Sequence, residues 1–271
     1  MAERFQDRLA LLDERLRVFL KILIHVGGYC TAEQAKRLGI AGSETRVLAR
    51  LRSLESASFL RRVAQYPVVY QTTGSATRLL EMDRRARRTH DAETVLNRLL
   101  AASFYLEARG WPAEFVFDHA VKVATLLDEC CPRNALPHRS GQPYLWEEFV
   151  LWLADGRIGI AIVDRHDRSP FGQLWGFAKR FGRLVLWLGD RLQLLVVTGS
   201  EARYWLYCRV ARHRSLQKLA APGLRITIKP YQVQRSTKSL QLLRQPNQLE
   251  LSNEHEPIAI HGHQNAQNNH F

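Results

Sequence analysis

The sequence predicts a mixed α/β protein in which a small helical unit with one hairpin precedes a larger unit built on a central sheet. Three observations predict this class. Apolar residues recur every three or four positions in three successive segments before residue 57, as in amphipathic helices. Two short strand-like runs follow, between residues 61 and 72. Beyond residue 111, apolar runs of strand length alternate with helical patterns, which favours one sheet flanked by helices.

The first predicted helix occupies residues 9–23, where leucine and phenylalanine side chains recur at helical spacing. Gly27 and Gly28 end this helix, because glycine readily adopts the left-handed conformation that closes helices. Thr31 then caps a short second helix. Gly39 closes the second helix, and the turn that follows leads into a third.

The third predicted helix begins after Ser43 as its cap and runs from Glu44 to about Ser56. Valine and leucine residues form its buried stripe, and small and cationic residues form the opposite face. A helix that enters the major groove needs such a face, because it must contact both base edges and phosphates. The sequence therefore predicts DNA contacts from Ser43, Thr45, Arg46, Ala49, Arg50, Arg52 and Ser53.

A hairpin is predicted after the third helix. Residues 61–64 and 68–72 have strand composition, and Gln65, Tyr66 and Pro67 form the turn between them. Three helices followed by a hairpin define a winged helix-turn-helix, which we assign to residues 1–88. In that fold Arg61, Arg62, Gln65 and Tyr66 would contact the DNA backbone. Two alternatives stay open: a winged helix used only for protein contacts, and a small helical domain with a solvated arginine face.

The charge of the chain points to a polyanionic partner. There are 39 Lys and Arg against 26 Asp and Glu, which gives a formal charge of +13 and a pI near 10.1. Residues 1–90 alone hold 17 basic and 9 acidic side chains. Nucleic acid and acidic lipid both attract such a surface. No apolar segment approaches the ~18 residues of a membrane span, so we predict double-stranded DNA as the partner, no membrane, and a cytoplasmic, nucleoid-associated location.

The four cysteines do not have the spacing of a metal site. Cys130 and Cys131 are adjacent, and no pair is separated by two residues as in a zinc knuckle. We therefore expect reduced thiols and no cofactor.

The remaining residues predict a linking helix, an α/β domain and a tail. Asp91 begins a helix within residues 89–110, which either joins the two domains or pairs with its copy in a homodimer. Residues 111–234 form the α/β domain, and residues 235–271, rich in Gln, Asn and His, form a flexible polar tail. The elements predicted in the α/β domain are a strand at 144–153, a turn at 155–156, an antiparallel strand at 157–164, a helix at 171–181, a strand at 192–198, a helix at 202–211 and a strand at 224–228.

This order of parts resembles the replication-relaxation family of plasmids and integrative mobile elements. The segments that carry the resemblance are TAEQAKRLGI, ETRVLARLRSL, YQTTGSATRLL, DAETVLNRLLAASFYLEARGW, PYLWEEFVLWLADGRIGIAIVD and LLVVTGSEARYWLYCRVA, within residues 18–229. The resemblance implies a winged helix joined to a restriction-endonuclease-like α/β domain. It also implies a role in plasmid biology or conjugation, with transfer or replication proteins of the element as further partners.

The sequence departs from that family where catalysis would occur. The resemblance implies a Pro-Asp step and an acidic residue on the next strand that together hold a divalent cation. Here the first position is Pro143-Tyr144, and on the next strand only Asp164 remains. Glu114 is the second vestigial candidate, whereas Glu147 and Glu148 are expected on the solvent face of a strand. We therefore predict a degenerate domain without catalytic residues, in which Mg²⁺ matters only under the nuclease alternative.

Three functions follow from these observations. The first is a sequence-specific DNA-binding protein of a mobile element, acting as transcriptional regulator or relaxosome accessory factor. The second is a metal-dependent nicking nuclease or relaxase that uses Glu114, Asp164 and other acids. The third is an adaptor for a replication or transfer complex.

Overall fold

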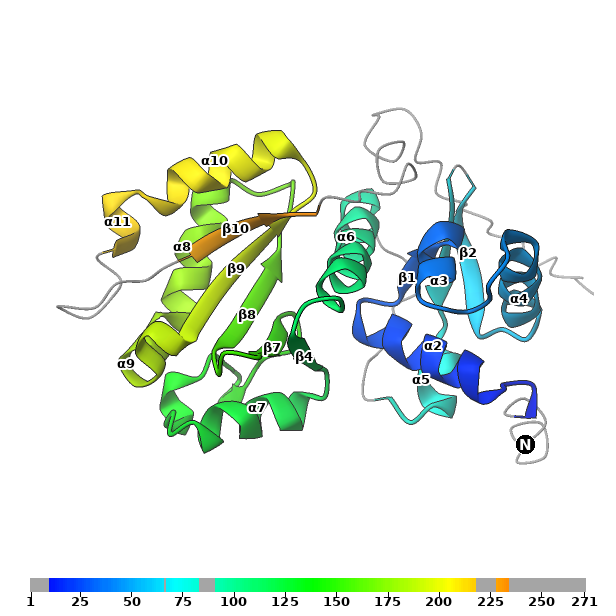
Figure 1. The fold of residues 1–271 in the computed structure, drawn as a ribbon, viewed down its shortest axis with the longest axis horizontal. Helices are drawn as coiled ribbons and strands as arrows, with labels where there is room; N and C mark the ends of the chain where they lie inside the picture. Colours follow the sequence, from blue (N-terminus) through cyan, green and yellow to red (C-terminus); the bar gives the residue numbers. More distant parts are fainter. Residues whose placement is uncertain (1–9, 66, 83–90, 218–227, 234–271) are drawn as a thin grey trace, which may run out of the picture.

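The structure, a computed structural model, describes residues 10–65, 67–82, 91–217 and 228–233 of the chain. It is mixed α/β, with a three-stranded and a five-stranded sheet (Figure 1). Helix α6 (Ala92–Ala108) lies between the two sheets and contacts β1 on one side and β8 and β9 on the other. Both sheets therefore share a buried cluster to which α6 contributes Leu100, Ala102 and Phe104.

The N-terminal part begins with three helices, α2 (Glu14–His25), α3 (Ala32–Arg37) and α4 (Glu44–Ser56), and the structure confirms the predicted second and third. The first, expected over residues 9–23, begins only at Glu14, because Asp13 caps it, and extends to His25. Each begins after a residue whose side chain accepts a hydrogen bond from the backbone N–H three positions on: Asp13, Thr31 and Ser43 respectively. At α3 the bond is reciprocal, because the side chain of Gln34 accepts from the backbone N–H of Thr31.

The predicted hairpin is present as β2 (Leu60–Gln65) and β3 (Val68–Thr72). A short strand that was not predicted, β1 (Tyr29–Thr31), pairs antiparallel with β3 and gives the strand order β1-β3-β2. Three buried residues are too few to show the alternation that identifies a strand in a sequence. A helix α5 (Gly74–Leu79), also unpredicted, follows β3.

The five-stranded sheet has the order β10-β9-β8-β7-β4. Strand β7 pairs antiparallel with both β4 and β8, whereas β8, β9 and β10 run parallel to one another. The strands are β4 (Ala113–Val116), β7 (Phe149–Leu153), β8 (Ile158–Val163), β9 (Leu192–Thr198) and β10 (Ile228–Gln232). A small hairpin of β5 (His138–Arg139) and β6 (Gln142–Pro143) precedes β7.

Alternating side chains bury both faces of this sheet. On β9, Leu195 and Val197 join the cluster beneath α6, whereas Leu194 and Val196 pack with Phe177 of α8 on the opposite face. The helices of that opposite face, with the connecting turns, are α7 (His119–Asp128), η1 (Arg133–Ala135), α8 (Pro170–Phe181), η2 (Gly182–Leu184), α9 (Val185–Leu188), η3 (Gly189–Arg191), α10 (Glu201–Ala211) and α11 (Arg214–Gln217).

Hydrogen bonds join α6 to the N-terminal part and to the five-stranded sheet. The buried Gln34 amide donates 2.8 Å bonds to the Leu99 carbonyl and to the Ser103 hydroxyl. Tyr231 of β10 donates through its hydroxyl to Glu107 at 2.9 Å. Because buried polar groups are costly to leave unpaired, these bonds favour a single placement of α6.

Two strand predictions need correction. The strand expected at residues 144–153 begins only at Phe149. The Lys122 ammonium donates hydrogen bonds to the carbonyls of Leu145 and Glu148, at 3.2 and 2.6 Å, so these carbonyls do not pair with a neighbouring strand. The last strand extends to Gln232, beyond its expected end, and residues 224–227 lie outside the described residues. The tail predicted from residue 235 also lies outside them.

No helix in the described part of the chain combines the length and the apolar character needed to cross a membrane.

Candidate nucleic-acid interface

The outward face of α4 is exposed along its whole length. Val47, Leu51 and Leu54 are buried on its inner side. The residues predicted to contact DNA are all exposed to solvent: Ser43, Thr45, Arg46, Ala49, Arg50, Arg52 and Ser53. In Figure 1, α4 lies at the edge of the molecule opposite the five-stranded sheet. Among the predicted residues, Ser43 already has a local role, because its hydroxyl caps the helix.

The arginines of α4 differ in their partners. Arg50 forms a 3.1 Å ion pair with Asp13, the N-cap of α2, and both side chains are about half exposed. Among the residues that the structure describes, Arg46 and Arg52 have no acidic partner within ion-pair distance. An exposed pair contributes little stability, so an anionic ligand could replace Asp13 at small cost. Arg46 and Arg52 are therefore the cations most available to a ligand, and Arg50 follows them.

The structure places the two arginines of the hairpin on opposite faces of the three-stranded sheet. Arg62 lies on the side of α4, where it forms a 3.2 Å ion pair with Glu55. Arg61 points the other way, and its Nε donates at 2.8 Å to Gln71 on β3. Gln65 is exposed near the hairpin tip, and Tyr66 lies outside the described residues. Only Arg62 of the two arginines thus shares a surface with α4.

Asp164, a vestigial catalytic candidate, is completely buried at the end of β8. Arg203 of α10 donates to both of its carboxylate oxygens, at 2.8 and 2.5 Å, and Tyr207 and Gln173 donate at 2.7 and 3.0 Å. Burial raises the pKa of Asp164, but the hydrogen bonds from Arg203 and Tyr207 outweigh it, so the net pKa is lowered. The arginine thus occupies the position in which a cation would neutralise this carboxylate.

Glu114 is not brought near Asp164. It is exposed on the edge strand β4, opposite Trp152, which in turn pairs with Ile158 at the start of β8. Asp164 follows six residues later along β8, which corresponds to about 20 Å of strand. The two predicted acids cannot share one ion. In the described part of the chain, no group of three or more His, Cys, Asp or Glu residues is arranged to hold a metal.

Glu148 is the acid that sequence reasoning misplaced. It was expected on a solvent face, but it is buried just before β7, where one oxygen accepts from Arg180 of α8 at 2.7 Å and the other has no hydrogen-bond partner. Burial raises the pKa of Glu148, against the charges of Arg180 and Lys122. A helix that packs over the strand end converts an apparent surface acid into a buried ion pair, which no local pattern reveals.

The Tyr144 side chain does not cover the predicted catalytic position. It is half-buried, and its hydroxyl contacts Arg139 at 3.2 Å and Glu147 at 3.5 Å. Tyr144 therefore belongs to the β5–β6 hairpin region rather than to the end of β8.

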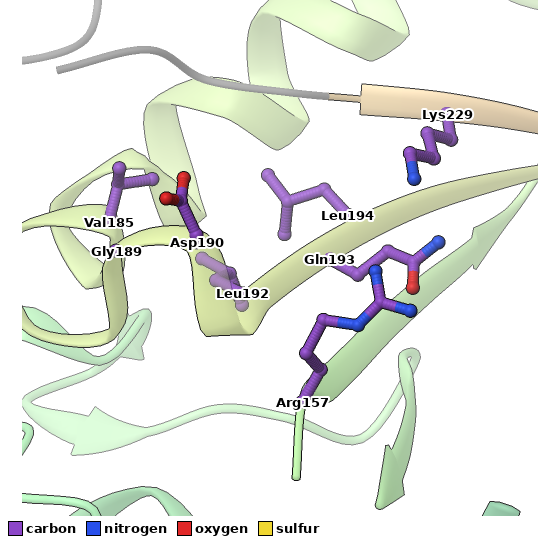
Figure 2. A pocket seen from close by; sticks show the side chains of 8 residues that line it. All are labelled: Arg157, Val185, Gly189, Asp190, Leu192, Gln193, Leu194 and Lys229. Carbon is purple, nitrogen blue, oxygen red and sulfur yellow. The ribbon is translucent and has the colours of Figure 1, made fainter. Parts of the chain in front are cut away.

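A cationic hollow lies at the opposite end of the large sheet from Asp164. Figure 2 shows Arg157, Gln193 and Lys229 directed toward one space, in a cavity of about 180 Å³ beside the start of β9. Arg157 already pairs with Asp155 of the β7–β8 turn. The hollow contains one carboxylate, Asp190, and supplies no acid–base pair for hydrolysis. The side chains of the hollow therefore give it positive charge but do not indicate a chemical reaction.

The thiols are free in all four cysteines. Burial raises the pKa of Cys30 to about 12 and that of Cys131 to about 11, so both are protonated at neutral pH and poorly nucleophilic.

No family model matches the chain, and no curated protein sequence or solved structure is significantly similar to it. The exposed face of α4, the arrangement of the hairpin and the state of the buried acids are therefore the observations on which a function must rest.

Proposed function

We propose that the protein binds double-stranded DNA at specific sites through a winged helix-turn-helix formed by α2, β1, α3, α4, β2 and β3. The observation that carries this proposal is the exposed row of small and cationic side chains along α4, namely Thr45, Arg46, Ala49 and Ser53. Such residues can approach base edges in the major groove, with arginine making paired bonds to guanine. The element order, with a hairpin after the third helix, supports the assignment.

The hairpin would provide backbone contacts beside the groove. The Arg62–Glu55 ion pair joins β2 to the last turn of α4, so the Arg62 side chain lies next to the proposed recognition helix. Contacts with phosphate fix position and orientation without selecting sequence. We propose that Arg62 has this role and that Arg61, on the other face, does not.

We further propose that the five-stranded unit has a restriction-endonuclease-like arrangement that acts as a scaffold rather than a cleavage centre. An antiparallel run of β4, β7 and β8 followed by a helical crossover to parallel β9 supports the arrangement. Among its described residues, the two buried acids, Glu148 and Asp164, are each paired with an arginine. The resemblance noted above adds the biological setting, a regulator or relaxosome accessory factor of a mobile element.

Duplex binding is expected to depend strongly on salt. If about six phosphates are neutralised, the logarithm of the association constant should fall with the logarithm of salt concentration at a slope of about −5. The measurement is a titration of a duplex selected from a random library, and of random duplex as reference, by fluorescence anisotropy at several salt concentrations. A slope near zero would contradict the proposal and favour an adaptor role.

The two hairpin arginines are expected to behave differently. Arg62→Ala should weaken binding to selected and random duplexes alike and reduce the salt slope by about one, as for one lost phosphate contact. Arg61→Ala removes the same charge from the opposite face and serves as the matched control. Equal losses in both variants would show that general charge, rather than the α4 side of the hairpin, contacts DNA.

A further inference from the structure

The outer face of α8 has a second surface whose composition differs from that of α4. At spacings of three or four residues, α8 and the residues that flank it carry exposed cations and aromatic rings that are more than one-third exposed. We name this set the aromatic–basic stripe: Arg168 before α8, Phe171, Trp175 and Lys179 on it, and Arg183 in η2. Beyond η2, Leu186 and Trp187 of α9 are also exposed, at 54% and 51%. Exposed aromatic rings at helical spacing are unusual on a surface that no partner covers.

The rings of the stripe are supported from one side and open on the other. Phe171 and Trp175 stack on each other, with ring centroids 5.9 Å apart and planes 24° apart. His213, which follows α10, packs edge-on against Phe171 at 5.3 Å. Both large rings remain more than one-third exposed, at 38% and 37%. Next to them Gly176 leaves open space where any other residue would project a side chain. The rings are thus held in place while part of each stays accessible.

The segment that carries this surface has a positive net charge. Residues 168–189 contain four basic side chains and no Asp or Glu. Arg180 is engaged by Glu148, but in the described ranges no acidic group lies within ion-pair distance of Arg168, Lys179 or Arg183. A partner with regularly spaced negative charge and flat groups that stack on rings would match this combination.

We propose that the aromatic–basic stripe binds single-stranded nucleic acid. Unpaired bases can stack on Phe171 and Trp175, whereas a duplex keeps its bases stacked inside. The cations, one or two helical turns from the rings, would accompany the phosphate backbone. The stripe lies on the far side of the five-stranded sheet from α6 and from the N-terminal part (Figure 1), so it is separate from the duplex-binding surface of α4.

The test measures binding of the full chain to a thymidine homopolymer of about 20 nucleotides, longer than the ~4–16 nucleotides that one such platform covers. Trp175→Ala and Phe171→Ala should each weaken binding by at least about five-fold, as expected for loss of one stacked base. Trp175→Phe should restore much of the affinity, because it keeps an aromatic face. Lys179→Ala combined with Arg183→Ala should reduce the magnitude of the salt slope by about 1.4, two single-strand phosphates.

The controls separate this proposal from the duplex proposal. Trp205→Ala removes an equally large exposed ring from α10. Trp205 lies two positions from both Arg203 and Tyr207, which face Asp164, so its side chain points away from α8 and its loss should not change binding. Arg46→Ala with Arg50→Ala should keep single-strand affinity, and the stripe variants should keep affinity for the selected duplex. Far-UV circular dichroism confirms that each variant is folded.

Several results would overturn the proposal. Single-strand affinity that is unchanged in the stripe variants, or that is lost only with the α4 arginines, would assign the binding elsewhere. Sedimentation with vesicles of phosphatidylglycerol and phosphatidylcholine, without binding of the homopolymer, would make the stripe a membrane contact. A dimer that the Trp175→Ala variant dissociates, again without homopolymer binding, would make it a contact between two copies. A uridine homopolymer that binds equally well supports the proposal and extends the ligand to RNA.

Discussion

Replacing Asp164 by alanine should destabilise the protein by roughly 3–5 kcal/mol, the range seen when one partner of a buried ion pair is removed. The variant leaves Arg203 with an uncompensated charge and deprives Tyr207 and Gln173 of a hydrogen-bond acceptor. These groups come from α8 and α10, so the packing of both helices on the end of β8 should loosen. Urea denaturation monitored by circular dichroism measures the change in the free energy of unfolding.

The matched control is Asp155→Ala, which removes a half-exposed carboxylate from a local pair with Arg157. Little change is expected there, because exposed pairs contribute little. If Asp164→Ala were as stable as Asp155→Ala, the buried cluster could not be what holds α8 and α10 at the end of β8.

The stability that Asp164 contributes should decrease as the pH is lowered. Its pKa is lower in the folded state than the unfolded value of about 3.9. The stability that it contributes is therefore present above pH ~4 and is lost as the pH falls through the folded pKa. The difference between the wild-type protein and Asp164→Asn should be large at neutral pH and shrink in acid. Glu148, whose raised pKa acts in the opposite direction, is common to both proteins and cancels in this comparison.

The double variant Arg46→Ala/Arg50→Ala should lose site-specific duplex binding. Each arginine that makes paired bonds to guanine contributes about 1–3 kcal/mol of discrimination, and tenfold in affinity corresponds to about 1.4 kcal/mol. Arg46 should have the larger single effect, because Arg50 must first exchange Asp13 for DNA. Titration of the selected duplex by anisotropy, with random duplex as competitor, measures the loss.

A control with the same change in charge is Arg133→Ala/Arg139→Ala, two exposed arginines before and within the β5–β6 hairpin. It should lower affinity slightly for all sequences and leave discrimination intact. If the α4 double variant and this control, both folded, distinguished the selected duplex from random duplex equally well, α4 would not be the helix that binds in the major groove.

The α4 region was accessible to sequence reasoning because its signals are local. Ser43 and Thr31 cap helices whose first backbone N–H groups lie only three residues away, and the buried stripe of α4 recurs within single turns. The bounds of α3 and α4 and the position of the hairpin followed directly from these patterns, whereas the start of α2 did not. The exposure of Arg46 agrees with the same periodicity, since it lies outside the stripe of Val47, Leu51 and Leu54, about a quarter of a turn to one side of it.

The ion-pair partners and the burial of the charged side chains could not be predicted from such local patterns. Asp164 meets Arg203 across 39 positions and Glu148 meets Arg180 across 32, and both pairs form only because α8 and α10 pack on one face of the sheet. The same packing hides Glu148 and leaves the other side of α8 open. Arg61 and Arg62 are neighbours in sequence, but strand alternation and the position of α4 assign them to opposite faces.

The sequence by itself thus determined the basic charge, the capped helices and the hairpin, because composition, periodicity and caps are properties of short segments. Only the tertiary structure decided which cations are available to a ligand and which acids are already neutralised. The physical reason is that a charge takes its role from the groups that surround it in space. For Arg46, Glu148 and Asp164 those groups are set by the packing of whole helices and strands against one another.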